Sequence, residues 1–278
     1  MPASGSLLRV GIAITTYNRR DQLCRQIERI RRFTTGAYEL VICDDGSTDG
    51  TPQALRGLGE AVIAGVNRGI AWNKNRGIFY LMALMGCDVA ILLDDDMLPE
   101  ETAWQARWVE GALRWGHVNF IAPGLVPGVD AAACTAAAPG AVARLLGSCI
   151  AFSRYPWSLV GYMDTRFGRY GHEHTEFSNR FLRNGFGGVI REGAREPAHY
   201  YYVISGAISL VAGTSSGTTA DIEANAAIWR QIIAERAHTY RAPWRNDTER
   251  LEFSAEMRLA IRERGLPVPC QSEDFLFF

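Results

Sequence analysis

The feature that most constrains the fold is an alternation, over the first hundred residues, of short apolar runs with longer amphipathic segments. The runs RVGIAIT, YELVICDD, EAVIAG and DVAILLDD are rich in β-branched residues and have the length of buried strands in a parallel sheet. Between them, RDQLCRQIERIRRF places Leu23, Ile27 and Ile30 on one helical face. A second helix is predicted from Trp72 to Gly86. We therefore expect an α/β fold with a Rossmann-like, mainly parallel central sheet flanked by helices.

Composition excludes several classes of protein. Of 278 residues, 47% are hydrophobic and 21% are charged, which excludes a disordered or collagen-like chain and predicts a real core. The formal net charge is -1, so we predict no nucleic-acid partner. The six cysteines contain no CxxC pair, which favours reduced, buried thiols in a cytoplasmic protein. No apolar run approaches the roughly 20 residues of a transmembrane helix, and a peripheral contact with the inner face of the membrane stays open.

The remainder of the chain alternates helical, loop and strand patterns. ETAWQARWVEGALRWG predicts a helix whose tryptophan stripe packs against the core, and residues 122–143 read as a long Ala/Gly/Pro-rich loop. LLGSCIAFSR predicts a further strand, and helical patterns fill the chain from about Asp221 onwards.

The ends of three predicted strands carry polar residues. They read TTYN, DDGS and DDD, and open parallel sheets bind their ligands at the carboxyl ends of strands. The adjacent carboxylates of Asp94, Asp95 and Asp96 repel one another unless a cation neutralises them, and Mg2+ or Mn2+ prefers such oxygen ligands. Asp45 can accept hydrogen bonds from a nucleobase or a ribose. The alternative for both motifs is turn or helix-cap chemistry.

The order of four motifs is more specific than any one of them. TTYNR, DDGSTDGT, NRGIAWNKNRGI and LLDDDM together resemble the nucleotide-binding half of GT-A glycosyltransferases, in particular the inverting enzymes of family 2, over roughly residues 8–100. Lys74 stands where an arginine is commoner in that family. Residues 147–187 are similar to the acceptor-side segment of the family and also resemble the C-terminal portion of the β-1,4-galactosyltransferase group. The matching positions in this block are Gly161, Asp164, Phe167, Glu173, Glu176, Phe177 and Arg180.

This resemblance implies a metal-dependent, inverting transfer of a hexosyl group from a nucleotide sugar, UDP- or GDP-linked, to an acceptor hydroxyl on a glycan, glycolipid or protein. It implies that Mn2+ or Mg2+ is bound by Asp96, with His199 as a further ligand. Asp94 or Asp95 would touch ribose or metal-bound water, and Lys74 would offset the charge of the diphosphate. Thr15, Tyr17 and Asp45 would form the nucleoside pocket, with Tyr17 stacked on the base.

The same resemblance divides the chain. Residues 1–205 would form the glycosyltransferase domain, with a nucleotide-binding half at about 8–100 and an acceptor half at about 101–205. Residues 206–278 would form a mainly helical C-terminal extension. The loop that follows Ile121 could close over a bound donor and exclude water.

One departure from the family concerns the general base. Where the family has Glu-Asp, this chain has Glu173-His174. Either side chain can take a proton from an acceptor hydroxyl, and the sequence leaves the choice open, with Asp164 and Glu176 as further candidates. A zinc site at His172, His174 and Glu176 lacks a fourth nitrogen or sulfur ligand nearby.

Three other functions remain as alternatives. The first is a catalytically inactive module that binds a nucleotide or a sugar. The second is a nucleotidyltransferase, although the chain lacks the glycine-rich phosphate loop of that class. The third is a haloacid dehalogenase-like phosphatase, which requires Thr or Val at the position of Leu98.

Overall fold

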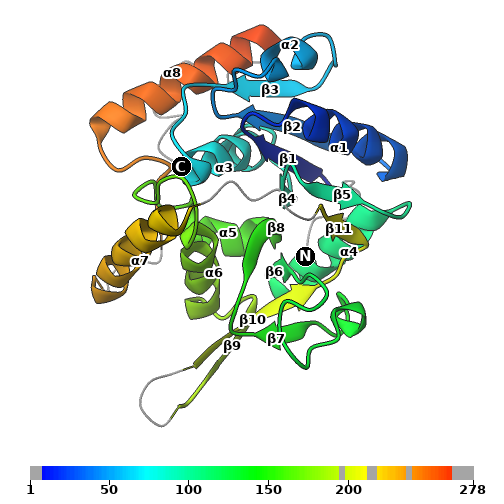
Figure 1. The fold of residues 1–278 in the computed structure, drawn as a ribbon, viewed down its shortest axis with the longest axis vertical. Coiled ribbons are helices and arrows are strands. Elements are labelled where there is room, and N and C mark those ends of the chain that lie inside the picture. The colour runs from blue at the N-terminus through cyan, green and yellow to red at the C-terminus, as the bar shows by residue number, and fades with distance from the viewer. Residues whose placement is uncertain (1–7, 194–197, 212–217, 236–239, 265–278) are drawn as a thin grey trace.

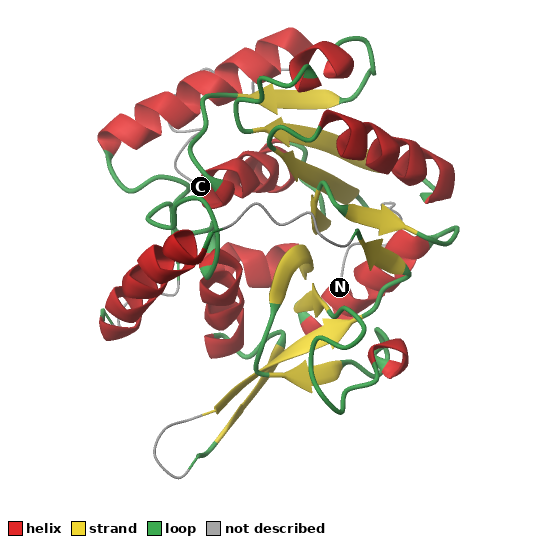
Figure 2. Cartoon of the chain, viewed as in Figure 1, coloured by secondary structure: helices red, strands yellow, loops and turns green. Residues whose placement is uncertain are grey.

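The computed structural model describes residues 8–193, 198–211, 218–235 and 240–264 (Figure 1). These residues form one large mixed sheet with the strand order β3-β2-β1-β4-β8-β6-β10-β7, in which β9 pairs with β10. The strands of this sheet are β1 (Val10–Thr16), β2 (Tyr38–Asp44), β3 (Ala61–Ala64), β4 (Val89–Asp94), β6 (His117–Phe120), β7 (Gly140–Val142), β8 (Leu146–Ser153), β9 (Gly188–Arg191) and β10 (Ala198–Ile204). Helices pack against the sheet, as the sequence predicts (Figure 2).

The first four strands are parallel, and their carboxyl ends meet at one edge. Thr15 of β1 lies opposite both Cys43 of β2 and Asp94 of β4 in the register. The helices of this half are α1 (Arg20–Phe33), α2 (Thr51–Leu55) and α3 (Ile70–Ile78). The apolar stripe of α1 is buried, as its spacing predicts. The three motifs at the strand ends are therefore neighbours in space.

The second predicted helix differs from expectation at both ends. It begins at Ile70, and its last turns, Phe79–Leu84, are a π-helix (η1). The N–H of Met85 donates to the carbonyl of Tyr80, five residues earlier, at 2.9 Å. A wider turn keeps a run of large side chains buried, which hydrophobic spacing alone does not reveal.

The second half of the sheet is not parallel. β8 runs antiparallel to both β4 and β6, while β10 is parallel to β6. Parallel pairing therefore joins β1 to β4 and also β6 to β10, and the sheet as a whole is mixed because β8 is inserted antiparallel between these two groups. The helices here are α4 (Trp104–Trp115), α5 (Arg154–Val160) and α6 (Glu173–Arg183). Trp104 and Trp108 are fully buried, which confirms that this tryptophan stripe packs in the core.

The segment predicted as a long loop, residues 122–143, contains a 3-10 turn (η2, Ala131–Ala133) and strand β7. β7 pairs with β10. Cys134 and Val142 join a small apolar cluster with Tyr201 and Val203 of β10. The segment is thus anchored at both of these places.

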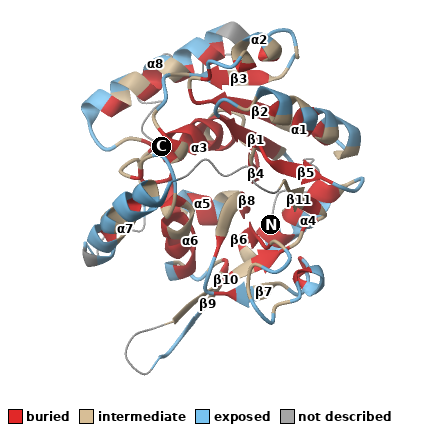
Figure 3. Ribbon diagram, in the orientation of Figure 1, coloured by how far each residue is buried: buried red, intermediate tan, exposed pale blue. Residues whose placement is uncertain are grey.

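The C-terminal part shares the core of the rest of the chain. Strand β11 (Ile208–Leu210) pairs with β5 (Met97–Pro99), and helices α7 (Thr219–Ala234) and α8 (Asp247–Arg264) follow. Helix α8 lies along β3, and Figure 3 shows buried positions along it. Its Phe253 and Met257 are fully buried in the same cluster as Trp72 and Phe79. The predicted boundary at residues 205 and 206 stays a prediction.

Cys24, Cys43, Cys87, Cys134 and Cys149 are free thiols, and all but Cys24 are buried. Cys270 lies outside the described residues. Within those residues, no helix is both long enough and apolar enough to cross a membrane.

Candidate active site

A cavity of about 950 Å3 opens at the edge where the carboxyl ends of β1, β2 and β4 meet. It brings together eight of the ten site residues predicted from the sequence. Those eight are Thr15, Tyr17, Asp45, Asp94, Asp95, Asp96, Glu173 and His174. The acidic strand ends and the start of α6 therefore face the same space, although some 80 residues separate them in the sequence.

The turns after β1 and β2 are tied to each other. The backbone N–H of Asn18 donates to Ser47 Oγ at 2.8 Å, and Asn18 Oδ1 accepts from the N–H of Thr48 at 2.7 Å. This pairing fixes the TTYN and DDGS turns side by side. Tyr17 stays 39% exposed at the cavity, where its ring can stack on a planar base.

Each of the three adjacent aspartates has a cationic partner, and two of them share the same one. Asp94 Oδ1 lies 3.1 Å from the ammonium of Lys74. Asp95 accepts from the hydroxyl of Thr16 at 2.7 Å, and its other oxygen lies 3.0 Å from Arg19 Nη1. The same Nη1 lies 3.2 Å from Asp96 Oδ2. One guanidinium therefore bridges two neighbouring carboxylates.

Lys74 and Arg19 do not fully offset the negative charge of the three aspartates at this edge of the sheet. Burial raises the pKa of Asp94 to about 6, although Lys74 acts in the opposite direction. Burial also raises the pKa of Asp95 to about 7 against the influence of Arg19. Neighbouring carboxylates add to both shifts, so a further cation would favour the ionised forms.

The chemistry of these side chains fits a hard divalent cation. The guanidinium of Arg19 stands in for such an ion between the oxygens of Asp95 and Asp96. In the part of the chain that the structure describes, no group of three or more His, Cys, Asp or Glu side chains could hold a metal by itself. Mg2+ or Mn2+ can be held by one or two carboxylates together with phosphate oxygens.

Asp45 organises the loop between β3 and α3. Its Oδ1 accepts from the N–H of Arg68 and from Arg76 Nη1, and its Oδ2 accepts from the N–H of Gly69 at 2.9 Å. Burial raises the pKa of Asp45, while these donors lower it. A carboxylate oxygen can accept two hydrogen bonds, so Oδ2 retains the capacity to accept one more on the cavity side.

Lys74 lies beneath the cavity and does not line it. The ammonium is fully buried and donates to the carbonyl of Gly147 at 2.7 Å, as well as pairing with Asp94. Gly147 also contacts His174, because a Cβ at this position would lie 2.6 Å from Nδ1 of that imidazole. Lys74 thus links the acidic edge to the strand on which His174 rests.

Glu173 and His174 begin helix α6. Their side chains meet, with His174 Nδ1 3.2 Å from Glu173 Oε1. Glu173 Oε2 is buried and, among the described residues, has no hydrogen-bond partner. Burial raises the pKa of Glu173, but His174 and Lys74 outweigh it and bring the pKa down to about 2. Glu173 therefore lines the cavity as an ionised carboxylate, and one of its oxygens, Oε2, is buried without a hydrogen-bond partner among the described residues.

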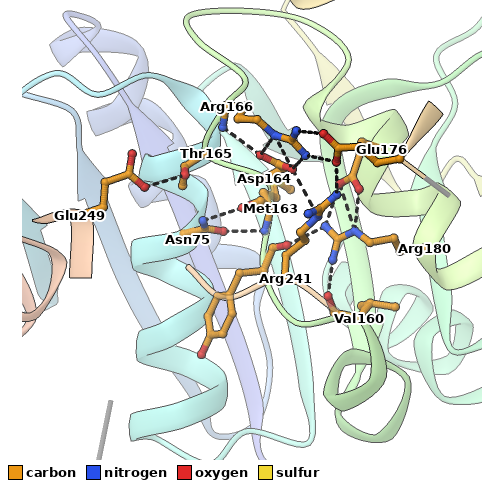
Figure 4. A network of polar contacts seen from close by, with 12 residues as sticks. Asn75, Val160, Met163, Asp164, Thr165, Arg166, Glu176, Arg180, Arg241 and Glu249 are labelled. Carbon is orange, nitrogen blue, oxygen red and sulfur yellow. Dashed lines mark hydrogen bonds and ion pairs between the residues drawn. The ribbon is translucent and has the colours of Figure 1, made fainter. Parts of the chain in front are cut away.

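Three other predicted candidates do not line the cavity. His199 lies on β10, with Nδ1 2.9 Å from Asn179 Oδ1. Asp164 pairs with Arg166 at 2.7 Å and with Arg241, and Glu176 pairs with Arg180 at 2.8 Å on the same helix (Figure 4). These carboxylates hold the segment before α6 in place.

Another contact in Figure 4 joins the two halves of the chain. The amide of Asn75 on α3 donates to the carbonyl of Met163 at 2.9 Å and accepts from the N–H of the same residue at 2.8 Å. This pairing mimics one rung of a sheet and is buried on both sides. The position of Asn75 was recognised in the sequence, but this structural role was not.

Sequence reasoning also missed several residues that line the cavity. They are Thr16, Arg19, Arg144, Arg169, Tyr170, His172, Asp221, Ile222 and Trp229. Arg19 is the last residue of the TTYNR motif, which gives no sign of its contact with the aspartates. The last three lie on α7, whose sequence carries no motif.

Comparisons with known proteins show what this chain is similar to. Residues 11–114 match glycosyl transferase family 2. An uncharacterized glycosyltransferase of Acanthamoeba polyphaga mimivirus is 29% identical over 200 residues, which are 64% of this chain and 75% of that protein. The family match covers the parallel half of the sheet and all four motifs.

Two solved structures share the fold. The mannosyltransferase PcManGT from Pyrobaculum calidifontis, in complex with GDP-Man and Mn2+, has a TM-score of 0.57 and 18% identity, covering 94% of this chain and 76% of that chain. S. aureus TarS 1-349, in complex with UDP, has a TM-score of 0.53 and 13% identity, covering 96% of this chain and 77% of that chain.

The resemblance of residues 147–187 to the β-1,4-galactosyltransferase group receives no support from these comparisons and stays a prediction. The sequence matches and the shared fold agree with each other. The chain is a glycosyltransferase that matches family 2 over residues 11–114 and shares the fold of GT-A glycosyltransferases.

Proposed function

We propose that this glycosyltransferase moves a hexosyl group from a UDP- or GDP-sugar to an acceptor hydroxyl, with inversion and with the help of Mn2+ or Mg2+. The observation that carries the proposal is the placement of two kinds of carboxylate around one cavity. Asp94, Asp95 and Asp96 form an acidic edge that can bind a cation, and Glu173 is an ionised carboxylate whose Oε2 has no hydrogen-bond partner among the described residues. The acidic edge could hold a cation that neutralises the charged leaving group, and Glu173 could take the proton of the acceptor hydroxyl.

The donor would lie along the strand ends. Tyr17 would stack on the base, Asp45 Oδ2 would accept from a base N–H, and Thr15 with Asp94 or Asp95 would face the ribose. The two solved neighbours hold GDP-Man with Mn2+ and UDP respectively, which supports a nucleoside diphosphate here without choosing the base. Lys74 would offset the charge of the diphosphate from beneath the cavity, where it forms an ion pair with Asp94.

Asp96 would be the direct ligand of the divalent ion. When bound, the ion would neutralise the diphosphate as it leaves. We do not extend the metal site to His199, because that side chain lies beside Asn179 and outside the cavity lining. Arg19 would have to leave its bridging position between Asp95 and Asp96 as the ion binds.

Glu173 would serve as the general base. The acceptor oxygen would attack the anomeric carbon while the bond to the diphosphate oxygen breaks, and the acceptor proton would pass to Glu173 Oε2. A single displacement of this kind inverts the configuration at that carbon. His174 would hold the carboxylate in place through Oε1, which leaves Oε2 for the reaction.

The free and mostly buried cysteines are consistent with a reducing compartment, so we place the reaction in the cytoplasm. A location at the inner face of the membrane would suit a glycolipid acceptor. Acceptors used in polysaccharide biosynthesis are equally compatible with the site.

The decisive experiment is calorimetric titration of UDP and GDP, with Mn2+ and with a chelator. We expect tight binding of one nucleotide only with metal, and loss of this metal dependence in Asp96→Asn. Asp88→Asn is the matched control, because Asp88 precedes the same strand and contacts Arg9 instead of the cavity. Equal affinity with and without chelator in the unmodified protein would refute the metal assignment. Binding without turnover of any donor would favour the inactive nucleotide-binding alternative.

A further inference from the structure

Helix α7 forms one wall of the cavity. Asp221, Ile222 and Trp229 of this helix line the same space as Glu173 and His174. Asp221, Asn225 and Trp229 are spaced by four residues, so they lie on one face of the helix. The ring of Trp229 on α7 lies 6.5 Å, between centroids, from that of His172, which directly precedes Glu173 at the start of α6 (Figure 1). The face of α7 that points inward is therefore close to the proposed base.

A single buried side chain fixes α7 to the loop before α6. Asn225 Oδ1 accepts from the N–H of Gly168 at 3.1 Å, and its Nδ2 donates to the carbonyls of Tyr170 and Gly171, each at 2.9 Å. Asn225 is only 2% exposed. These three hydrogen bonds hold the loop and the helix as one unit, so the side chains of both present a fixed surface.

That surface carries three rings. Tyr170 is 40% exposed, and Trp229 is partly exposed. The rings of His172 and Trp229 lie nearly parallel, with an interplanar angle of 16° and centroids 6.5 Å apart. His172 has a φ of 69°, a left-handed conformation that is uncommon for a residue with a side chain. The unusual backbone directs this ring towards Trp229, next to the proposed base in the sequence.

Hydrogen-bonding groups border the rings. Asp221 and Arg169 line the same part of the cavity, and Arg169 is exposed. Burial lowers the pKa of His172, so at neutral pH this ring is an uncharged aromatic face. The surface thus combines flat apolar faces with a carboxylate and a guanidinium at their margin.

A pyranose ring has complementary chemistry. One of its faces presents C–H groups that pack on aromatic rings, and its edge presents hydroxyls that bond to carboxylate and guanidinium groups. We propose that α7 and the loop 169–172 form the acceptor subsite, and that the acceptor is a carbohydrate whose ring packs on Trp229 and Tyr170. This inference rests on the proposed function, because it takes Glu173 as the base that such an acceptor would meet.

A carbohydrate suits this wall better than a lipid chain. An alkyl chain needs a continuous apolar groove, whereas Arg169 and Asp221 stand beside the rings at this wall. A peptide acceptor would pair with backbone groups, and the carbonyls of Tyr170 and Gly171 each already accept one hydrogen bond from Asn225. Transfer to a lipid or to a peptide is therefore a separate outcome of the experiment.

The test compares Trp229→Ala and Trp229→Phe with Ile233→Ala. Ile233 is an exposed apolar residue of the same helix that does not line the cavity, so its variant controls for changes to α7 in general. Transfer from the donor is measured with a panel of free mono- and oligosaccharides, and in parallel with a lipid alcohol and a Ser/Thr peptide. Donor affinity and the slow hydrolysis of the donor by water are measured in the same preparations.

We expect Trp229→Ala to raise the KM for the saccharide about tenfold, equivalent to about 1.4 kcal/mol. Donor affinity and donor hydrolysis should not change, because water needs no ring surface. Trp229→Phe should recover most of the loss, and Ile233→Ala should behave like the unmodified protein. If Trp229→Ala fails to fold, Tyr170→Ala must show the same selective rise in KM.

Several results would overturn the inference. One is transfer to the lipid alcohol or the peptide but to no saccharide, with donor binding intact. Another is an equal loss of donor affinity in Trp229→Ala, which would place the ring in the donor site. These results leave the proposed function standing. Absence of nucleotide binding in the unmodified protein would instead refute the proposed function, and the inference with it.

Discussion

Arg76 and Glu256 stand 180 positions apart in the chain and form a two-point ion pair, with Nε 2.9 Å from Oε2 and Nη2 3.0 Å from Oε1. The guanidinium is fully buried, and its Nη1 lies 3.0 Å from Asp45 Oδ1. Glu256 also accepts from the indole N–H of Trp72 at 3.0 Å. The C-terminal helix α8 is thereby connected, through one arginine, to the residue assigned to the nucleoside.

The first prediction follows from this connection. Glu256→Gln leaves Arg76 with Asp45 as its one remaining carboxylate, and we expect the free energy of unfolding to fall by about 1.5–3 kcal/mol, as for a lost charged hydrogen bond. Glu252→Gln is the control, since Glu252 lies on the same helix and forms a more exposed pair with Arg68, worth at most about 1 kcal/mol. Urea denaturation measures both. Equal losses in the two variants would contradict the prediction.

Sequence reasoning located the site because its signals are local. Residues at the ends of neighbouring parallel strands must meet at one edge, so the positions of Thr15, Asp45 and Asp96 followed from the strand pattern. Glu173 and His174 were recognised from a family pattern, and the structure places both in the same cavity.

The remainder depends on contacts that no local pattern encodes. The sequence predicts that Lys74 offsets the charge of the diphosphate, but it does not reveal that the ammonium is buried under the cavity in an ion pair with Asp94. The cavity wall formed by α7 depends on the hydrogen bonds between Asn225 and the loop before α6. The antiparallel insertion of β8 likewise reflects pairing between strands that are distant in sequence.

The second prediction concerns nucleoside recognition. In Asp45→Asn, the amide keeps the shape of the side chain but removes the anionic acceptor. We expect the affinities for the free nucleoside diphosphate and for the nucleotide sugar to fall together, by about 1.5–3 kcal/mol. Asp49→Asn is the control, because Asp49 accepts hydrogen bonds from the hydroxyl of Thr51 and from the backbone N–H of Arg20 and does not line the cavity. A change in kcat alone, with both affinities intact, would remove Asp45 from the nucleoside pocket.

The third prediction concerns Arg19. Because its guanidinium bridges Asp95 and Asp96, it competes with a divalent cation for the same oxygens. Arg19→Gln should therefore increase the affinity for Mn2+ in the absence of nucleotide, on the order of tenfold for the loss of one positive charge at this range. Electron paramagnetic resonance of free Mn2+ measures this directly. Arg20→Gln, an exposed neighbour that pairs with Asp21, should leave the affinity unchanged. A lower Mn2+ affinity in Arg19→Gln would show that the guanidinium organises the carboxylates instead of competing.

The fourth prediction concerns stability against pH. His117 is fully buried, donates through Nδ1 to the carbonyl of Ala151, and stacks on Phe181. Burial lowers its pKa to about 3, whereas an unfolded histidine titrates at about 6.5. Between these two values the unfolded state holds one more proton, so the free energy of unfolding should fall as pH falls, by about 1.4 kcal/mol per pH unit.

Denaturation at pH 5, 6, 7 and 8 tests this slope. His117→Gln should be less stable at every pH but should lose the contribution of one proton between pH 6 and 5. The interval from pH 7 to 8 is the internal control, because an unfolded histidine with a pKa of about 6.5 is already mostly deprotonated there and the slope should be small. An unchanged acid slope in the variant would mean that other groups carry the dependence.

The last prediction separates Glu173 from His174 as the base. The pKa of Glu173 is brought down to about 2 because His174 and Lys74 outweigh its burial, so its carboxylate is ionised throughout the range from pH 5 to 8. If Glu173 is the base, titration of this carboxylate should not make kcat depend on pH in that range. Glu173→Gln should lower kcat by about 10²–10⁴-fold with little change in nucleotide affinity. A base with the ordinary pKa of an imidazole, about 6.5, would instead give a rate that rises between pH 5.5 and 7.5.

His174→Ala provides the complementary measurement. Removing the imidazole takes away the largest influence that lowers the pKa of Glu173, so the carboxylate should become a stronger base with a pKa closer to its ordinary range. We therefore expect an acid limb to appear in the profile of His174→Ala, with measurable turnover above it. If His174 were the base, its removal would abolish turnover at every pH instead. Glu192→Gln, an exposed carboxylate outside the cavity, is the control. Near-normal turnover in both Glu173→Gln and His174→Ala would exclude this pair and require the base to lie elsewhere in the cavity.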